Sequence, residues 1–158
     1  MEELRPIWWE NDRAYILDQR ALPNRRRVIV CEKPEHVAEA VRSMAIRGAP
    51  ALGVAAAMGI ALAALGGGTR ADLLARVEKA SQLMIATRPT AYNIRWATER
   101  MLRRARESDG SVEDIRKQLV AEALSIERED YEACRAIGEF GARLLQDGDR
   151  VLTHCKRP

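Results

Sequence analysis

Short apolar runs separated by turn residues occupy the first 31 positions of the chain. Apolar segments at residues 7–9, 14–17 and 28–30 are divided by Glu10-Asn11-Asp12 and by Leu22-Pro23-Asn24, and both tripeptides are typical of turns. Short apolar runs bounded by turn residues predict β-strands. We therefore expect a small antiparallel sheet that lies against helices.

Helical spacing of apolar residues replaces this pattern from about residue 34 to about residue 146. Pro34 and Pro50 suit the first turns of two helices, because those turns do not use the amide hydrogen that proline lacks. The glycine run at 66–68 ends the second helix, and a fourth helix is expected to start near residue 88 and reach about residue 106. The loop at 108–111 precedes the last helix.

Apolar stripes mark the faces of these helices that should be buried. The expected members are Val37, Val41 and Met44 in the first helix, Leu73, Val77, Ala80 and Met84 in the third, and Val112, Ile115, Leu119, Ala123 and Ile126 in the last. Cys134, Ile137, Gly141 and Leu144 are expected to continue the last stripe after a bend.

The final residues change character again. After a turn at 147–149, residues 150–155 form a short apolar segment that predicts a buried strand. A single strand needs partners in a sheet, so we expect this segment to be the first strand of a second domain that the chain does not contain. The expected organisation is a sheet-plus-helical domain at residues 1–146 and the beginning of another domain at 147–158. The expected fold class is α+β, mainly α.

Composition indicates a globular, cytoplasmic protein. Apolar residues make up 47% and charged residues 31% of the 158, and the net charge of only +3 does not favour a nucleic-acid partner. The longest apolar run, at 49–65, is shorter than the roughly 20 residues that span a membrane. Cys31, Cys134 and Cys155 match no metal-site spacing, so free thiols are expected, with Cys31 and Cys134 in the core.

Arg47-Gly48-Ala49-Pro50, at the start of the second predicted helix, could bind an anion. Gly48 would let a ligand approach the backbone amides, the helix dipole adds positive potential, and Arg47 supplies a planar set of donors. An ordinary helix start with a solvent-exposed arginine has the same pattern. The motif alone leaves both interpretations open.

Thr87-Arg88-Pro89-Thr90 repeats this arrangement before the fourth helix, where Thr87 or Thr90 could cap free amides. Arg47 and Arg88 could hold one phosphate together if the two helix N-termini converge. Cys155, at the end of the last apolar segment, could be a nucleophile or an acid–base group, or an inert buried thiol.

Taken in order, these motifs resemble those of the methylthioribose-1-phosphate isomerases. The matching segments lie at residues 17–19, 22–23, 44–53, 88–93, 96–97 and 152–155. The resemblance covers nearly the whole chain, and several motifs in one order are far more specific than any single one.

The resemblance implies an N-terminal sheet-and-helix part followed by a Rossmann-like domain. Members of the family convert 5-methylthioribose 1-phosphate into 5-methylthioribulose 1-phosphate in methionine salvage, need no cofactor or metal, and are homodimers. It also implies that Arg47, Gly48, Ala49 and Arg88 bind the substrate and that Cys155 is catalytic.

This sequence departs from the family at its end. Lys156-Arg157-Pro158 stands where the family has Asn, a small residue and Gly, and the family's catalytic Asp, expected far downstream, has no counterpart. We therefore expect little or no isomerase activity from this chain alone. An apolar face left uncovered by a missing domain also predicts a homo-oligomer.

Three other functions remain open at this point. Regulatory subunits of translation initiation factor 2B are similar to these isomerases in fold and would be interaction proteins. A ribose-1,5-bisphosphate isomerase would use a similar phosphate site, and a helical dimerisation module would bind no sugar phosphate. The two arginine motifs favour the methylthioribose-1-phosphate isomerase.

Overall fold

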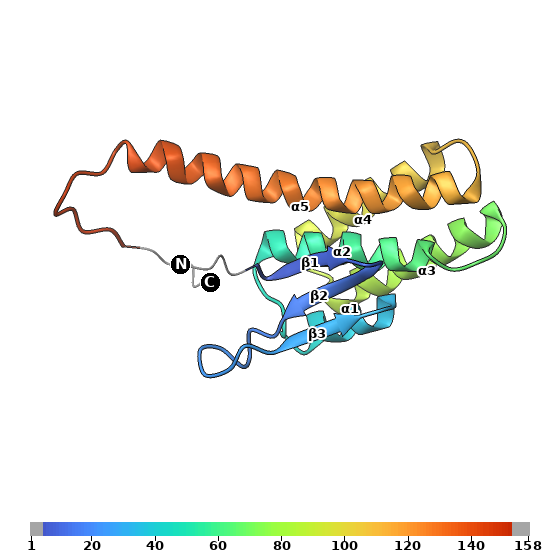
Figure 1. Ribbon diagram of the computed structural model, residues 1–158, viewed down its shortest axis with the longest axis horizontal. Coiled ribbons are helices and arrows are strands. Elements are labelled where there is room, and N and C mark those ends of the chain that lie inside the picture. The colour runs from blue at the N-terminus through green and yellow to red at the C-terminus, as the bar shows by residue number, and fades with distance from the viewer. Residues whose placement is uncertain (1–4, 153–158) are drawn as a thin grey trace.

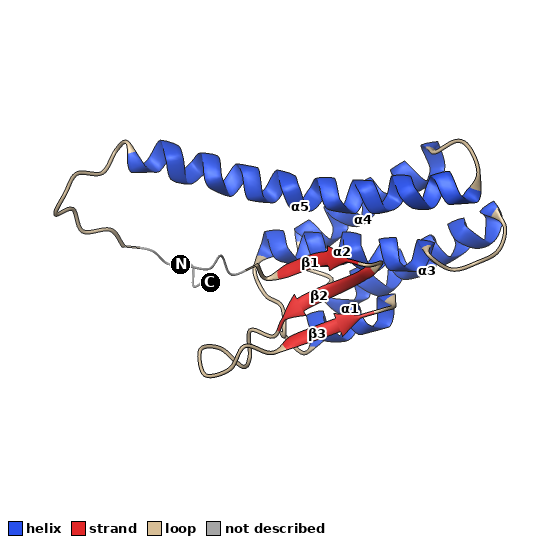
Figure 2. Ribbon diagram, viewed as in Figure 1, coloured by secondary structure: helices blue, strands red, loops and turns tan. Residues whose placement is uncertain are grey.

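Five helices and a three-stranded sheet make up the fold (Figures 1 and 2). The computed structural model describes residues 5–152. The elements are β1 (Ile7–Glu10), β2 (Arg13–Leu17), β3 (Val28–Cys31), α1 (Pro34–Arg42), α2 (Ala49–Ala64), α3 (Arg70–Thr87), α4 (Tyr92–Glu107) and α5 (Val112–Ala142). The predicted α+β, mainly α fold class is confirmed.

The sheet is antiparallel, with β2 between β1 and β3. Its register places Ile7, Ile16 and Ile29 side by side, on the face that packs against the helices. The alternation of a strand places the next residues on the other face, where the rings of Trp8 and Tyr15 stack with centroids 5.4 Å apart. One face of the sheet therefore completes the core, and the other is partly exposed.

Helix α2 is the centre of the molecule. It packs against the other four helices and against β1 and β2, and every residue from Ala51 to Ala64 is buried. Its alanines and glycines let neighbouring helices approach closely, so that a Cβ added to Gly59 would lie 2.9 Å from Cε of Met84 in α3. Within residues 5–152, neither α2 nor any other helix is both long and apolar enough to cross a membrane.

Two arginines from neighbouring helices bind the carboxyl end of α2. Arg76 of α3 donates from Nε to the carbonyl oxygen of Ala63 at 3.0 Å and from Nη2 to that of Gly66 at 2.7 Å. Arg116 of α5 donates from Nε to Ala64 at 3.2 Å and from Nη2 to Gly66 at 2.5 Å. The last carbonyl groups of a helix have no partner within it, and they carry partial negative charge. The two guanidinium groups supply hydrogen-bond donors to these carbonyl groups and positive charge beside them.

Only the first half of α5 packs on the rest of the molecule. Ile115, Leu119, Ala123 and Ile126 are buried, as the apolar stripe predicted. The helix then projects past the body of the bundle (Figure 1) and continues without interruption to Ala142. The distal half of α5, residues 131–142, is therefore almost entirely exposed.

The predicted continuation of the α5 stripe is wrong. Ile137 and Leu144 are 71% and 83% exposed, and Cys134, which we expected in the core, is exposed as well. The helix carries these residues beyond the helices that bury its first half. The other expected core thiol, Cys31, is fully buried, as predicted.

Met44 does not extend the apolar stripe of α1. The helix ends at Arg42, and Met44 has a φ of 59° and a side chain 47% exposed. The amide groups of Met44 and Ala45 donate to the carbonyl oxygens of Val41 and Ala40, which closes the end of the helix. A left-handed residue after the last turn is a common way to satisfy these carbonyls, and here Met44 takes that position.

The structure tests little of the predicted second domain at the C-terminal end of the chain. Helix α5 ends at Ala142, slightly before the predicted end at residue 146. Residues 150–152 have no regular structure, and the remainder of the predicted strand, 153–155, lies outside the described residues. The division at 146 stays a prediction.

Candidate functional site

The N-termini of α2 and α4 lie at the same end of the bundle. Gly53 of α2 contacts the first turn of α4 so closely that an added Cβ would lie 3.1 Å from the backbone oxygen of Asn93. The two helices pack along each other and run in the same direction (Figure 1). Their positive ends are therefore side by side. The helix starts that follow Arg47 and Arg88 therefore lie at one end of the bundle, and a phosphate held by both arginines stays a prediction.

Gly48 and Pro50 leave the first turn of α2 open. Gly48 is the N-cap, with φ 97° and ψ 127°, a conformation that favours glycine. No side chain caps the helix there, and an added Cβ at Gly48 would meet no atom within 4 Å. Pro50 has no amide hydrogen, and the amide of Leu52 donates to the carbonyl oxygen of Gly48. The amides of residues 48, 49 and 51 are thus the donors available to a ligand.

Arg47 has a fixed backbone and a free side chain. The preceding residues, Ala45 and Ile46, are completely buried, whereas Arg47 is exposed. Its guanidinium group has no hydrogen-bond or ion-pair partner in the part of the chain that the structure describes. It is available to an anion at the start of α2.

Arg88 ends α3 and precedes α4. It is half-buried, its carbonyl oxygen accepts the amide of Ala91 at 2.9 Å, and its guanidinium has no partner among residues 5–152. Neither threonine of the motif caps α4, contrary to our expectation. The N-cap is Ala91, and the Thr87 hydroxyl donates backwards to the carbonyl oxygen of Met84 at 2.5 Å. The first amides of α4 therefore stay without a side-chain cap.

The helix starts at this end differ from the others in their charge. The remaining helices all have acidic residues in their first turns, namely Glu35 in α1, Asp72 in α3, and Glu113 and Asp114 in α5. Helices α2 and α4 have none, and they also have no side-chain cap, whereas α3 and α5 have full capping boxes. An acidic residue would compete with a bound anion. Its absence at both convergent helix starts makes this end suitable for a phosphate.

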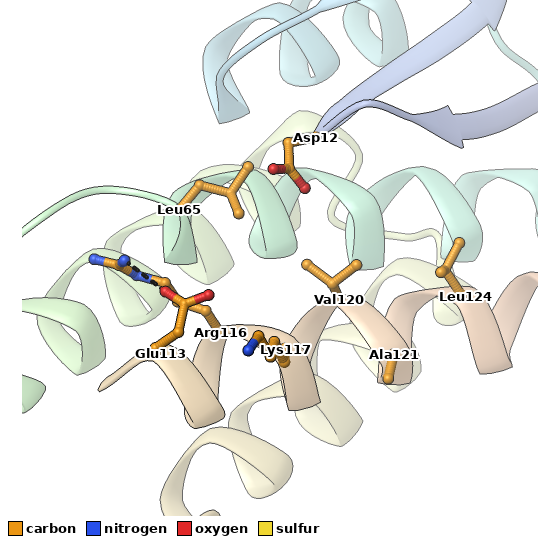
Figure 3. Close-up of a pocket in the computed structure, with 8 residues that line it drawn as sticks. All are labelled: Asp12, Leu65, Glu113, Arg116, Lys117, Val120, Ala121 and Leu124. Atoms are coloured by element: carbon orange, nitrogen blue, oxygen red, sulfur yellow. Dashed lines mark hydrogen bonds and ion pairs between the residues drawn. The ribbon is translucent and has the colours of Figure 1, made fainter. Parts of the chain in front are cut away.

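The pocket of Figure 3 lies at the opposite end of α2. It has a volume of about 380 Å³ and is lined by Asp12, Leu65, Glu113, Arg116, Lys117, Val120, Ala121 and Leu124. Glu113 and Arg116 form an ion pair at 3.1 Å on its wall, and Arg116 also binds the end of α2. Of its two cations, Arg116 is therefore already engaged and Lys117 remains, and the pocket is not part of the α2–α4 site.

The described residues offer little acid–base or metal chemistry. Burial raises the pKa of the Cys31 thiol to about 11, which keeps it protonated and inert. No group of three or more His, Cys, Asp or Glu side chains within residues 5–152 is arranged to hold a metal ion. Cys155, the predicted catalytic residue, lies outside the described residues.

Comparison with known proteins confirms the resemblance. Residues 45–157 match the Initiation factor 2 subunit family. The chain is 45% identical over 150 residues to the methylthioribose-1-phosphate isomerase of Desulforudis audaxviator, an alignment that covers 94% of this chain and 43% of that protein. It is 48% identical over 157 residues to the Chloroflexus aurantiacus isomerase, with 97% and 45% covered.

Two solved structures share the fold. The 5-methylthioribose 1-phosphate isomerase of Pyrococcus horikoshii superposes with a TM-score of 0.88 at 37% identity, over 93% of this chain and 42% of that one. The delta subunit of translation initiation factor eIF-2B from A. fulgidus gives 0.86 at 40% identity, over 93% and 43%. The chain spans less than half the length of the relatives that it matches. It belongs to the Initiation factor 2 subunit family.

Proposed function

We propose that this chain is the N-terminal, phosphate-binding part of an aldose–ketose isomerase that acts on 5-methylthioribose 1-phosphate. One observation carries the proposal: two helix N-termini without side-chain caps or acidic residues lie side by side, and each follows an arginine that has no partner within residues 5–152. The names of the relatives with about 45% identity give the substrate. In this proposal Arg47, Arg88 and the amides of residues 48 and 49 hold the phosphate.

Turnover needs groups that this site does not supply. Moving hydrogen between two sugar carbons requires an acid and a base near the substrate carbons. We propose Cys155 as one of these groups, with residues 147–158 beginning a second, Rossmann-like domain. The chain alone should therefore bind the sugar phosphate and turn it over little or not at all, as a cytoplasmic homo-oligomer.

Titration of the chain with 5-methylthioribose 1-phosphate tests the binding site. Arg47→Ala and Arg88→Ala should each weaken binding about tenfold or more, because each removes a charge-assisted hydrogen bond to phosphate. Arg103→Ala is a matched control, since Arg103 is an exposed arginine of α4 without a partner in the described residues. No binding by the unaltered chain would overturn the proposal.

An activity assay tests the missing chemistry. The chain should be inactive beside a version extended through the second domain of a relative, and the extended version should lose activity on Cys155→Ser. Activity in neither version would favour the second candidate, a regulatory subunit. The likeness to the A. fulgidus eIF-2B delta subunit supports that candidate. Competition by ribose 1,5-bisphosphate would show whether that sugar is the preferred ligand.

A further inference from the structure

We propose that Gln19 is a positioning residue for the phosphate site, an inference that rests on the proposed function. Gln19 lies two residues after the end of β2, is 8% exposed, and makes two hydrogen bonds to the segment between α1 and α2. Its backbone amide donates to the carbonyl oxygen of Ala45 at 2.9 Å. Its side-chain Nε2 donates to the carbonyl oxygen of Arg47 at 3.5 Å.

The side-chain bond is the one that reaches Arg47. The amides of Ala45 and Ile46 both donate to the carbonyl oxygen of Ala40, and their side chains are buried, so the core holds the segment up to residue 46. The next anchor is the bond from the amide of Leu52 to the carbonyl oxygen of Gly48, inside α2. Between these anchors, Gln19 provides the only hydrogen bond to the Arg47 carbonyl oxygen in the described part of the chain.

The direction of that peptide decides which group meets a ligand. A trans peptide is planar, and its carbonyl and amide groups point in opposite directions. Because Gln19 is buried and holds the Arg47 carbonyl oxygen, the amide of Gly48 points away from Gln19. An added Cβ on Gly48 would meet no atom within 4 Å, so the surroundings of this residue are open. A reversed peptide would present a carbonyl oxygen, which repels phosphate. Gln19 thus keeps a donor, not an acceptor, at the site.

A neutral amide suits this position. The neighbouring Asp18 is also buried, and its carboxylate binds Arg20 at 2.7 and 2.8 Å, so that the two charges cancel. The other charged groups near this segment are Arg47, Arg27, whose charge acts on Asp18, and Glu39, whose charge acts on Arg20. An ionised side chain at position 19 would add a negative charge at this buried position and could not donate to the Arg47 carbonyl oxygen.

Two substitutions test the inference. Gln19→Leu should weaken binding of 5-methylthioribose 1-phosphate about tenfold, since a donor is lost. It should also shift the amide NMR signal of Gly48 in the free chain. Gln19→Glu should weaken binding near pH 7 and recover toward the unaltered chain as the pH falls, because a protonated carboxyl group can donate again.

For Gln19→Glu, the dissociation constant is divided by that of the unaltered chain at each pH. A general loss of stability would not make this ratio fall toward 1 as the pH falls. If the unaltered chain binds and both variants bind equally well at every pH, the positioning role is wrong while the proposed function stands. If the unaltered chain does not bind the sugar phosphate, the proposed function fails, and this inference fails with it.

Discussion

Gly53 shows how one hydrogen atom in place of a side chain determines the geometry of the candidate site. An added Cβ would lie 3.1 Å from the oxygen and 3.3 Å from the Cβ of Asn93, both closer than ordinary contact. Since one of these atoms belongs to the backbone, the start of α4 would have to move. The position of Gly53 in α2 is therefore set by the neighbouring helix.

Gly53→Ala should separate stability from binding. Alanine gains about 0.5–1 kcal/mol over glycine inside a helix, which offsets much of the cost of the contact with Asn93. We expect nearly unchanged stability in denaturant but weaker binding of sugar phosphate, because the two helix starts move apart. Gly138→Ala in exposed α5, where an added Cβ meets no atom within 4 Å, is the control and should leave binding unchanged. Equal binding by Gly53→Ala would show that helix spacing does not matter.

Glu129 gives a prediction for pH. Arg100 of α4 donates to both oxygens of Glu129 in α5, at 2.5 and 2.7 Å, and this lowers the pKa of Glu129 from 4.5 to about 2. A carboxyl group whose pKa is lowered by folding stabilises the folded chain at every pH above the pKa that it has in the unfolded chain. That contribution disappears as the pH falls toward 2. Glu129→Gln should therefore cost free energy of unfolding at pH 7 and progressively less below pH 4.5.

The size of the Glu129 effect is limited by solvent, because its side chain is 47% exposed. We expect a loss of at most about 1 kcal/mol at neutral pH. Urea unfolding between pH 7 and pH 2.5 measures it, with Glu107→Gln, at an exposed carboxylate without an ion-pair partner in residues 5–152, as the control. A cost that persists at the acid end would rule out the ion pair as its cause.

At the scale of elements, the end of α2 depends on other helices. Arg76→Ala removes donors from the carbonyl oxygens of Ala63 and Gly66 and should cost about 1–2 kcal/mol of unfolding free energy. Arg103→Ala, in α4, should stay within about 0.5 kcal/mol of the unaltered chain. Denaturant unfolding of the two variants measures the difference. Equal free energies of unfolding for Arg76→Ala and Arg103→Ala would mean that water replaces the Arg76 guanidinium without loss.

The two halves of α5 should respond differently to truncation of apolar side chains. Leu119→Ala should cost about 2–5 kcal/mol at any protein concentration, because Leu119 is fully buried within the chain. Ile137→Ala removes an exposed side chain, so its cost should be near zero in dilute solution and grow with concentration if copies associate through the distal half of α5. Unfolding midpoints at two concentrations test this. A concentration-independent loss at Ile137 would show that the chain buries this residue itself.

Elements whose signals are local were predicted well from the sequence. Leu73 and Met84 follow one face of α3, and spacing alone identifies that face. Spacing does not show whether another helix covers a face, which is why the distal half of α5 was wrongly placed in the core. Met44 continues the spacing of α1, but the backbone has already turned at its position.

The sequence predicted individual residues of the candidate site but not how those residues are arranged in space. Arg47 was correctly placed at a helix start, but Arg88 is the C-cap of α3, and α4 begins only at Tyr92. The common end of α2 and α4 follows from packing between these two helices. The bond from Gln19 to Arg47 joins residues 28 positions apart, and no local pattern indicates it. One useful signal was present and was missed: the first turns of α2 and α4 contain no acidic residue, unlike those of the other helices.

At the scale of the whole molecule, the direction of the helices groups its features at opposite ends. Helix α5 begins beside the carboxyl end of α2, where Arg116 binds, and runs back along the bundle. Its distal half therefore extends past the end at which α2 and α4 begin (Figure 1). The open helix starts and the exposed apolar part of α5 consequently lie toward one end, and the arginine-bound end of α2 lies at the other.

The enclosure of α2 has a consequence for hydrogen exchange. Because the helix is buried from Ala51 to Ala64, its hydrogen-bonded amide protons, beyond the open first turn, should reach solvent only when the entire molecule unfolds. Their exchange rate then measures the free energy of global unfolding. A ligand that binds only the folded chain should slow these amides in proportion to 1 + [L]/Kd, while amides in the distal half of α5 should exchange rapidly with or without it. Exchange at α2 would thus detect binding even where no reaction occurs.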